Sequence, residues 1–370
     1  MTSDKFFQIN QDRGFPKSDN PQVTWDGQLT KQQRQASLEI IDSISQNKDH
    51  LLWAVTGAGK TETLFPVIEA VIKAGKRIAL AAPRIDVVLE LSPRIKAAFA
   101  GIQVLTMYGG VEVEYFRAQI TVMTTHQLMK FQDGFDLIII DEVDSFPFVS
   151  SEQLEFAVQR ALKLNGNLVY LSATPTEKLL KLYKAKKLNT SFLARRFHTR
   201  LLPQIKVAYQ SDWQTQKDKK KLHGRLKREI EKLEKDHQRF LLFVPTVDML
   251  EPLLKQIHSE FKMRGETVWS GDEKRKEKVI LMREGKIDFL ITTTILERGV
   301  TLPGIDVIIF GADHINFNKN ALIQIAGRVG RSLDRPYGLV LAILEVKNRQ
   351  VVQAIKQINF MNKKAKEMYE

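Results

Sequence analysis

No cysteine occurs among the 370 residues of this chain, so disulfide bonds, thiol catalysis and cysteine-ligated zinc are excluded for it. Long apolar runs are missing too, since no stretch approaches the roughly 20 residues that a membrane-spanning helix needs. The first ten residues also lack the apolar segment of a secretory signal. We therefore expect a protein of the cytoplasm that does not insert into a membrane.

Negative charge is in deficit. Asp and Glu number 43 against 56 Lys and Arg, which gives a formal net charge of +13. Such a balance favours an acidic partner, and nucleic acid is the commonest one. The hydrophobic content of 43% is that of a globular protein, and 370 residues exceed what one core usually serves. We predict an irregular lead-in over residues 1–27 and two domains over 28–200 and 201–370.

Short apolar runs alternate with segments of helical pattern along both predicted domains. Because apolar strands that alternate with helices form parallel sheets buried on both faces, we predict two α/β domains, each with a mostly parallel sheet between helices. A strongly basic segment, 217–238, carries apolar residues at helical spacing and predicts a half-exposed surface helix; a DNA contact there stays open. The predicted strands are 77–82, 102–107, 120–123, 137–140, 168–171, 240–244, 289–293, 307–310 and 339–343.

A glycine-rich turn separates one apolar run from the helical pattern that follows it. Strand, glycine turn and helix in that order are typical of a phosphate-binding loop, because backbone N–H groups there point at an anion. Lys60 would reach the β- and γ-phosphates of ATP, and Thr61 would help to hold Mg²⁺. The pattern departs from the usual one only at Ala54, where glycine is expected. The predicted nucleotide-binding residues are Thr56, Gly57, Ala58, Gly59, Lys60 and Thr61.

Two adjacent acids, Asp141 and Glu142, follow the apolar strand at 137–140. Hydrolysis of ATP needs one carboxylate to hold Mg²⁺ and another to orient or deprotonate the attacking water. Adjacent acids at the end of a parallel strand can divide these tasks. We predict that Asp141, with Thr61, holds the metal and that Glu142 acts on the water.

In the second domain, Gln324, Arg328 and Arg331 are spaced i, i+4 and i+7, so on a helix they share one face. One amide and two guanidinium groups suit the charge of a γ-phosphate in the transition state. The glycines at 327 and 330 indicate a close approach of other groups. Hydroxyl residues at other strand ends could bind phosphates, relay between the domains, or only cap their strands.

Taken together, the order and spacing of these motifs over about residues 28–345 resemble the superfamily 2 helicase core. The resemblance implies two tandem RecA-like domains with ATP in the cleft between them, and it implies that Gln33 reads the adenine. It further implies DNA contacts by Arg84, Thr124, Thr125, Thr293 and Thr294. The residues implied to couple ATP to DNA are Asp144, Ser172, Thr174, Arg298 and Gly299.

Details of several runs, beyond what the shared core itself requires, resemble the ComFA family, the competence ATPases of Gram-positive bacteria. That resemblance implies an ATP-driven translocase on single-stranded DNA, which brings transforming DNA into the cytoplasm and contacts ComFC and the membrane DNA channel. It implies a cytoplasmic location, attachment to the inner face of the membrane only through partners, and it allows an oligomer. These runs are 54–62, 83–87, 124–128, 141–144, 195–198 and 293–301.

One departure from the ComFA family concerns zinc. Members usually carry a four-cysteine zinc module before the motor, and this chain has no cysteine. The sequence is therefore either a truncated form or a member without the module, and zinc is not expected in it.

Two other functions stay open at this stage. One is a strand-separating DNA helicase of repair or replication restart, although no inserted wedge hairpin is evident in the sequence. The other is a nucleotide-gated scaffold without turnover. The presence of Lys60, Glu142 and Arg331 together argues against that scaffold, because an inactive site need not keep them all.

Overall fold

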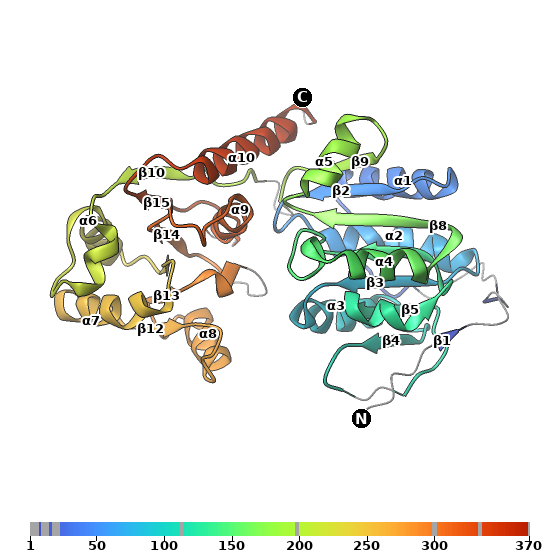
Figure 1. Cartoon of the computed structure of the whole chain (residues 1–370), viewed down its shortest axis with the longest axis horizontal. Helices are drawn as coiled ribbons and strands as arrows, with labels where there is room; N and C mark the ends of the chain where they lie inside the picture. The colour runs from blue at the N-terminus through green and yellow to red at the C-terminus, as the bar shows by residue number, and fades with distance from the viewer. Residues whose placement is uncertain are drawn as a thin grey trace. The chain divides into compact units, whose positions relative to one another are not determined.

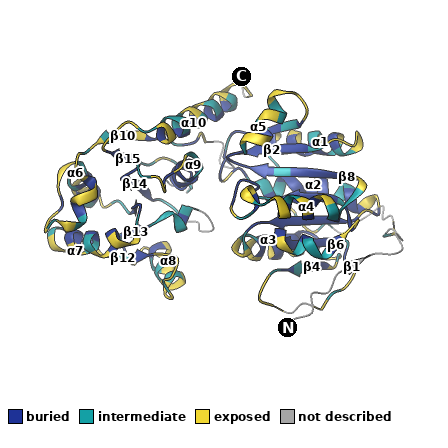
Figure 2. Cartoon of the chain, in the orientation of Figure 1, coloured by how far each residue is buried: buried dark blue, intermediate teal, exposed yellow. Residues whose placement is uncertain are grey.

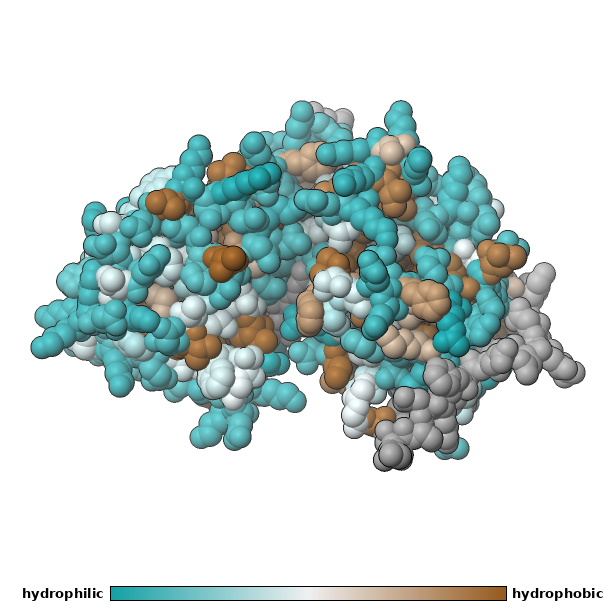
Figure 3. Space-filling model, in the orientation of Figure 1, coloured by the Kyte–Doolittle hydropathy of each residue, from teal (hydrophilic) through white to brown (hydrophobic). Residues whose placement is uncertain are grey.

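A computed structural model describes residues 7–8, 15–16, 23–111, 114–196, 200–297, 302–331 and 335–368. The chain divides into two compact units, Met1–Phe197 and His198–Glu370, and each is described by itself (Figure 1). Among the described residues, every helix is too short or too polar to cross a membrane. On the face shown in Figure 3, apolar side chains appear as separate spots on a largely hydrophilic surface.

The first unit is built on seven parallel strands in the order β4-β5-β3-β7-β8-β2-β9. The inner strands β3 and β5 are buried along their whole length, which explains their continuous apolar sequence. The prediction of a parallel sheet is confirmed. The strands are β2 (His50–Ala54), β3 (Ile78–Ala82), β4 (Val104–Met107), β5 (Ile120–Thr124), β7 (Phe135–Ile140), β8 (Leu162–Ser172) and β9 (Asn189–Leu193).

Helices cover this sheet, and their buried sides face it while their exposed sides face solvent (Figure 2). The first of them is capped at Thr30: the Thr30 hydroxyl accepts from the backbone of Gln33, and the Gln33 side chain accepts from the backbone of Thr30. The helices are α1 (Lys31–Ser45), α2 (Lys60–Lys73), α3 (Ile85–Ala98), α4 (Glu152–Ala161) and α5 (Glu177–Lys184). Short elements are β1 (Phe7–Gln8), β6 (Phe131–Gln132), η1 (Thr125–Lys130) and η2 (Phe148–Ser150).

The second unit holds six parallel strands in the order β10-β15-β14-β11-β13-β12. Their bounds are β10 (Lys206–Tyr209), β11 (Phe240–Phe243), β12 (Gly265–Val268), β13 (Phe289–Thr292), β14 (Asp306–Phe310) and β15 (Val340–Leu344). The helical segments are η3 (Trp213–Asp218), α6 (Gly224–Lys235), η4 (Val247–Met249), α7 (Leu250–Glu260), α8 (Arg275–Arg283), η5 (Thr294–Glu297), α9 (Lys319–Ala326) and α10 (Arg349–Glu367).

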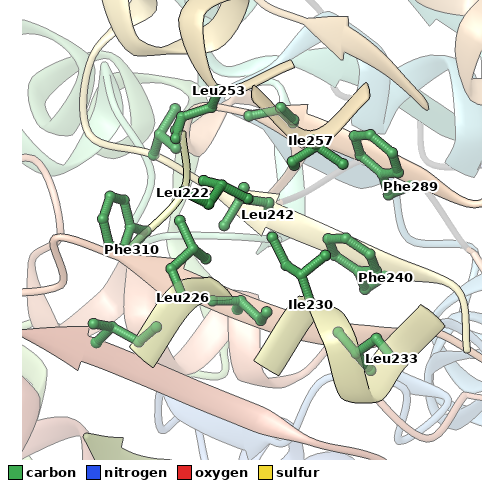
Figure 4. Packing of buried hydrophobic residues seen from close by; sticks show 14 of the residues in the cluster. Leu222, Leu226, Ile230, Leu233, Phe240, Leu242, Leu253, Ile257, Phe289 and Phe310 are labelled. Atoms are coloured by element: carbon green, nitrogen blue, oxygen red, sulfur yellow. The ribbon is translucent and has the colours of Figure 1, made fainter. Parts of the chain in front are cut away.

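The basic segment predicted as one helix over 217–238 is wrong in its first part. A short 3-10 turn ends at Asp218, and α6 begins only at Gly224, whose φ of 63° is unlike that of a helix. The apolar stripe itself is present, since Leu226, Ile230 and Leu233 are buried against β11 and α7 (Figure 4). The opposite side of α6 is therefore left for its charged residues.

A buried polar network joins α1, β2 and β9 beneath the phosphate-loop strand. The His50 ring lies 2.8 Å from the Ser43 hydroxyl through Nδ1 and 2.9 Å from the Ser191 hydroxyl through Nε2. Ser191 in turn donates to the Glu39 carboxylate, and Asn189 donates to Ser43. Burial lowers the pKa of His50 to about 4, so the ring is neutral at neutral pH.

The burial of His50 makes the free energy of unfolding depend on pH. Because the folded pKa of His50, about 4, lies below its ordinary value of 6.5, the unfolded chain binds more protons between these two values. The stabilisation is fully present above pH 6.5 and is lost as pH falls through this window, by about 3 kcal/mol in all. Urea unfolding at several pH values should show this loss in the wild type and a smaller one in His50→Gln, which does not titrate. Equal pH dependence in both would contradict the assignment.

Candidate active site

The glycine turn lies where β2 ends in the first sheet and α2 begins. Gly57 and Gly59 have φ values of 78° and 74°, a region that residues with a Cβ rarely adopt. No atom lies within 4 Å of the position that a Cβ on Gly57 would take, so the turn is open on that side. Lys60 and Thr61 are the first two residues of α2, where backbone N–H groups lack partners within the helix. The turn therefore has the geometry of an anion site.

An ion pair connects this turn to the end of β7. Lys60 Nζ lies 2.7 Å from Asp141 Oδ1, and both side chains are largely buried. Burial alone would lower the pKa of the Lys60 ammonium, but the carboxylates of Asp141, Glu142 and Asp144 outweigh it and raise that pKa. Lys60 is therefore charged at any physiological pH and is surrounded by more negative than positive charge.

Glu142 has an unusual backbone, with a φ of 53°. A positive φ is uncommon for a residue with a side chain and marks positions that the surroundings hold in place. Its N–H donates to Asp141 Oδ1 at 2.8 Å, and the Ser145 hydroxyl donates to its Oε2 at 3.2 Å. Ser145 gives no signal in the sequence, because a serine three residues after an acid is too common to indicate a function.

The carboxylate of Asp144 is tied to the neighbouring strand β8. Ser172 and Thr174 each donate a hydroxyl hydrogen bond of 2.6 Å to it, and Ser172 also accepts from the N–H of Thr174 at 2.9 Å. All three residues are buried. Asp144, Ser172 and Thr174, which the resemblance implies in coupling, thus form one hydrogen-bonded unit.

Gln33 contacts the phosphate loop itself. Its amide Nε2 donates to the carbonyls of Ala58 and Gly59 at 3.0 and 3.2 Å, while its Oε1 serves the cap of α1. A side chain on Gly59 would collide with this amide, 2.3 Å from the position of a Cβ. Gln33 therefore fixes the shape of the turn, and adenine recognition by it stays a prediction.

The residues at the turn suit a nucleotide with Mg²⁺. The Thr56 hydroxyl oxygen is buried with no hydrogen-bond partner, as expected of a group that serves a ligand. Hydroxyl and carboxylate oxygens, here those of Thr61 and Asp141, are the ligands that Mg²⁺ prefers. The described residues contain no cluster of three or more His, Asp and Glu side chains that would hold a metal alone. Phosphate oxygens would complete the set, as is usual for Mg²⁺.

The predicted DNA contacts of the first unit lie at one edge of its sheet. β3 and β5 pair with Ala82 opposite Thr124, so Arg84 and Thr125 follow adjacent strand ends. Thr124 and Thr125 are buried, and Arg84 is half-buried. The Thr125 hydroxyl has no hydrogen-bond partner. Contacts of these residues with DNA stay predictions.

The motif of the second unit does not continue as a helix. α9 carries Gln324 but ends at Ala326, and a turn follows in which Gly330 has a φ of 72°. The prediction that Gln324, Arg328 and Arg331 share one helical face is therefore wrong, because the glycines allow the chain to leave the helix.

Hydrogen bonds of Arg328 and Arg331 fix this turn. Arg328 is buried and donates through Nε to the carbonyl of Glu297 at 3.0 Å, which joins the turn to η5. Arg331 donates through Nε to the carbonyl of Gly327 at 2.9 Å. Thr294 is the first residue of η5, Thr293 directly precedes it, and both are half-buried. Arg298 and Gly299 lie outside the described residues.

Comparison with protein families gives two matches. The DEAD/DEAH box helicase model matches residues 30–182, and the model of the helicase conserved C-terminal domain matches residues 221–332. The first match includes the phosphate loop and the acids after β7. The second includes Gln324, Arg328 and Arg331.

Comparison with individual proteins gives more specific relatives. Competence protein ComFA of Bacillus subtilis is 42% identical over 346 residues, which cover 93% of this chain and 74% of that protein. Competence protein ComFA of Streptococcus pneumoniae is 42% identical over 356 residues, or 95% of this chain and 82% of that protein. ATP-dependent DNA helicase RecG of Aquifex aeolicus is 25% identical over 348 residues, or 87% of this chain and 42% of that protein.

Among solved structures, S. cerevisiae Dbp5 bound to RNA and ADP BeF3 superposes with a TM-score of 0.62. The two sequences are 17% identical, and the matched region covers 92% of this chain and 94% of the Dbp5 chain. This likeness concerns the fold alone, and it confirms two tandem RecA-like domains.

The Asp144 unit predicts a specific stability effect. Ser172→Ala should lower the free energy of unfolding by about 1–3 kcal/mol, because a buried carboxylate loses a donor and the N–H of Thr174 loses its acceptor. Urea unfolding measures this. As a control, Ser150→Ala removes an exposed serine hydroxyl elsewhere in residues 1–197 and should change the free energy of unfolding by less than about 0.5 kcal/mol. Equal effects of the two substitutions would show that the hydrogen bonds to Asp144 are dispensable.

Proposed function

This chain belongs to the ComFA family of competence proteins, and from that premise we propose that it is an ATP-driven translocase on single-stranded DNA that draws transforming DNA into the cytoplasm. The family and its two helicase domains make the chain a helicase-like, DNA-dependent ATPase. The observation that carries the proposal is the pairing of Lys60 with Asp141 at 2.7 Å, beside the open glycine turn.

The residues of the first unit divide the work on ATP. We propose that Lys60 and the N–H groups of the turn bind the β- and γ-phosphates, and that Thr61 and Asp141 hold Mg²⁺. The metal, when bound, offsets the negative charge of the phosphates. Glu142, held by the Ser145 hydroxyl, orients the attacking water and accepts its proton.

The remaining roles are proposed on the same basis. Arg328 and Arg331 would offset charge on the γ-phosphate, and Gln324 would assist them. The hydrogen-bonded unit around Asp144 would pass the state of the ATP site to the DNA contacts, because its hydroxyls reach from one strand end to the next. We assign the DNA contacts to Arg84, Thr124, Thr125, Thr293 and Thr294, and further coupling to Ser172, Thr174, Arg298 and Gly299.

The family membership and the charge of the chain support a proposal for its partners and location. The net charge of +13 suits single-stranded DNA bound through its phosphates, without preference for base sequence. We propose that the protein works in the cytoplasm at the inner face of the membrane, next to ComFC and the DNA channel, and that it reaches the membrane only through them.

Glu142→Gln should bind ATP as well as the wild type does and hydrolyse it about 10²–10⁴ times more slowly, because the amide keeps the shape but cannot take a proton. Nucleotide affinity by fluorescence and steady-state ATPase with single-stranded DNA measure the two effects. Glu155→Gln, at an exposed acid that pairs with Lys178 on the same unit, is the matched control and should hydrolyse normally. If the hydrolysis rate of Glu142→Gln falls by less than about tenfold, another residue must orient and deprotonate the attacking water.

Translocation and strand separation can be told apart directly. A translocase should displace streptavidin from one end of a biotinylated single-stranded oligonucleotide when ATP is added, and it should leave a fluorescent duplex with a single-stranded tail largely intact. The matched control is Glu142→Gln, which should do neither. Efficient release of the duplex strand would instead favour a strand-separating helicase.

A further inference from the structure

The edge strand β10 of the second sheet is open along one side. Among the described residues it pairs only with β15 (Figure 1). Gln210, next after the strand, donates its N–H to the carbonyl of Leu344 at 3.0 Å. Because successive residues of a strand alternate in direction, the N–H and C=O groups of Val207 and Tyr209 point away from β15. The strand thus offers both donors and acceptors at its free edge.

A groove of about 480 Å³ runs beside this edge. One wall is residues 207–211, and the other is the first turns of α6, with Gly224, Arg225 and Arg228. α6 cannot turn away from the groove, because its apolar side is packed in the core (Figure 4). The groove is therefore a fixed feature with an open strand on one side and a helix on the other.

Positive charge lines the helix wall of the groove. Arg228 is exposed. Arg225 pairs through Nη2 with Glu229 at 2.7 Å, and that carboxylate is shared with Lys232 at 3.0 Å. The Nε of Arg225 is buried and has no hydrogen-bond partner. The wall therefore carries more positive than negative charge, which favours an acidic occupant.

The two faces of β10 differ in character. Ala208 packs against the core on the side that α6 covers. Val207 and Tyr209 project to the opposite side and are 39% and 61% exposed. An added strand would thus have one row of side chains near the arginines and the other row beside an apolar and an aromatic residue.

We propose that the groove between β10 and α6 binds an extended, acidic segment of a partner protein, which adds to the sheet as a further strand. Its backbone would pair with Val207 and Tyr209, alternate acidic side chains would meet Arg225 and Arg228, and the residues between them would be apolar. The surface shares no residue with the proposed ATP site, so this inference stands apart from the proposed function.

A single DNA strand is a poorer occupant of the same groove. Phosphate oxygens only accept hydrogen bonds, so they would leave the outward carbonyls of Val207 and Tyr209 without donors. A peptide strand supplies a donor and an acceptor at the required repeat. The free strand edge therefore favours a peptide, although the arginines alone would suit either.

The test uses the full chain and a fluorescent synthetic peptide of about eight residues in which glutamate and valine alternate. A peptide of equal composition with the glutamates and valines in two blocks is the control. Fluorescence anisotropy should show roughly tenfold tighter binding of the alternating peptide. Equal affinity for the two peptides, or no binding of the alternating one at millimolar concentration, would overturn the proposal.

Three variants locate the binding. Val207→Pro removes an outward N–H at an edge position where proline is tolerated, and it should abolish binding. The double substitution Arg225→Glu with Arg228→Glu should also abolish it. Lys235→Glu makes a charge reversal on the same helix outside the groove and should bind as the wild type does.

Two further measurements interpret the variants. All three variants should keep wild-type ATPase activity, which would show that they fold. If Val207→Pro loses that activity, the peptide binding of the double arginine variant alone tests the proposal. Unchanged peptide binding in the arginine pair would overturn the proposal. So would displacement of the peptide by a short oligothymidine that itself loses affinity in the arginine pair, since the groove would then be a nucleic-acid site.

Discussion

The contact between the Lys60 ammonium and the Asp141 carboxylate is the interaction on which the proposed site depends. Lys60 lies in the first turn of α2, after β2, and Asp141 directly follows β7; these two strands are separated by β8 and so lie about 10 Å apart. Because the strands run parallel, both carboxyl ends meet at one edge of the sheet, and the long lysine side chain spans the remaining gap. The order of strands is therefore a functional constraint as well as a packing one.

The strand between them is used as well. β8 ends in Ser172, and the hydroxyls of Ser172 and Thr174 hold Asp144, three residues beyond Asp141. Three adjacent strand ends are thus joined by charged contacts over a short distance. With Mg-ATP bound, Lys60 would have phosphate as its partner and Asp141 would have the metal.

The sequence predicted the centre of each sheet well and its edges poorly. Buried strands such as β3 and β11 are continuous apolar runs, which are easily recognised. Apart from the two-residue strands β1 and β6, the strands that were missed are β9, β10 and β12, which lie at sheet edges, where half-exposed positions admit polar residues. The helix expected to carry Arg328 and Arg331 ends at Ala326, and the spacing of residues alone cannot show where glycine turns the chain. The contacts of the Gln33 amide with the carbonyls of Ala58 and Gly59 join separate parts of the chain, so no local pattern encodes them.

If the pair of Lys60 and Asp141 belongs to a working, DNA-driven ATPase, steady-state ATP hydrolysis by the full chain should depend on DNA. It is measured with no DNA, with single-stranded DNA and with blunt duplex DNA. We expect slow turnover without DNA, strong stimulation by single-stranded DNA and little by duplex, with all activity lost in Lys60→Ala. Turnover that is indifferent to DNA, or that survives the loss of Lys60, would contradict it.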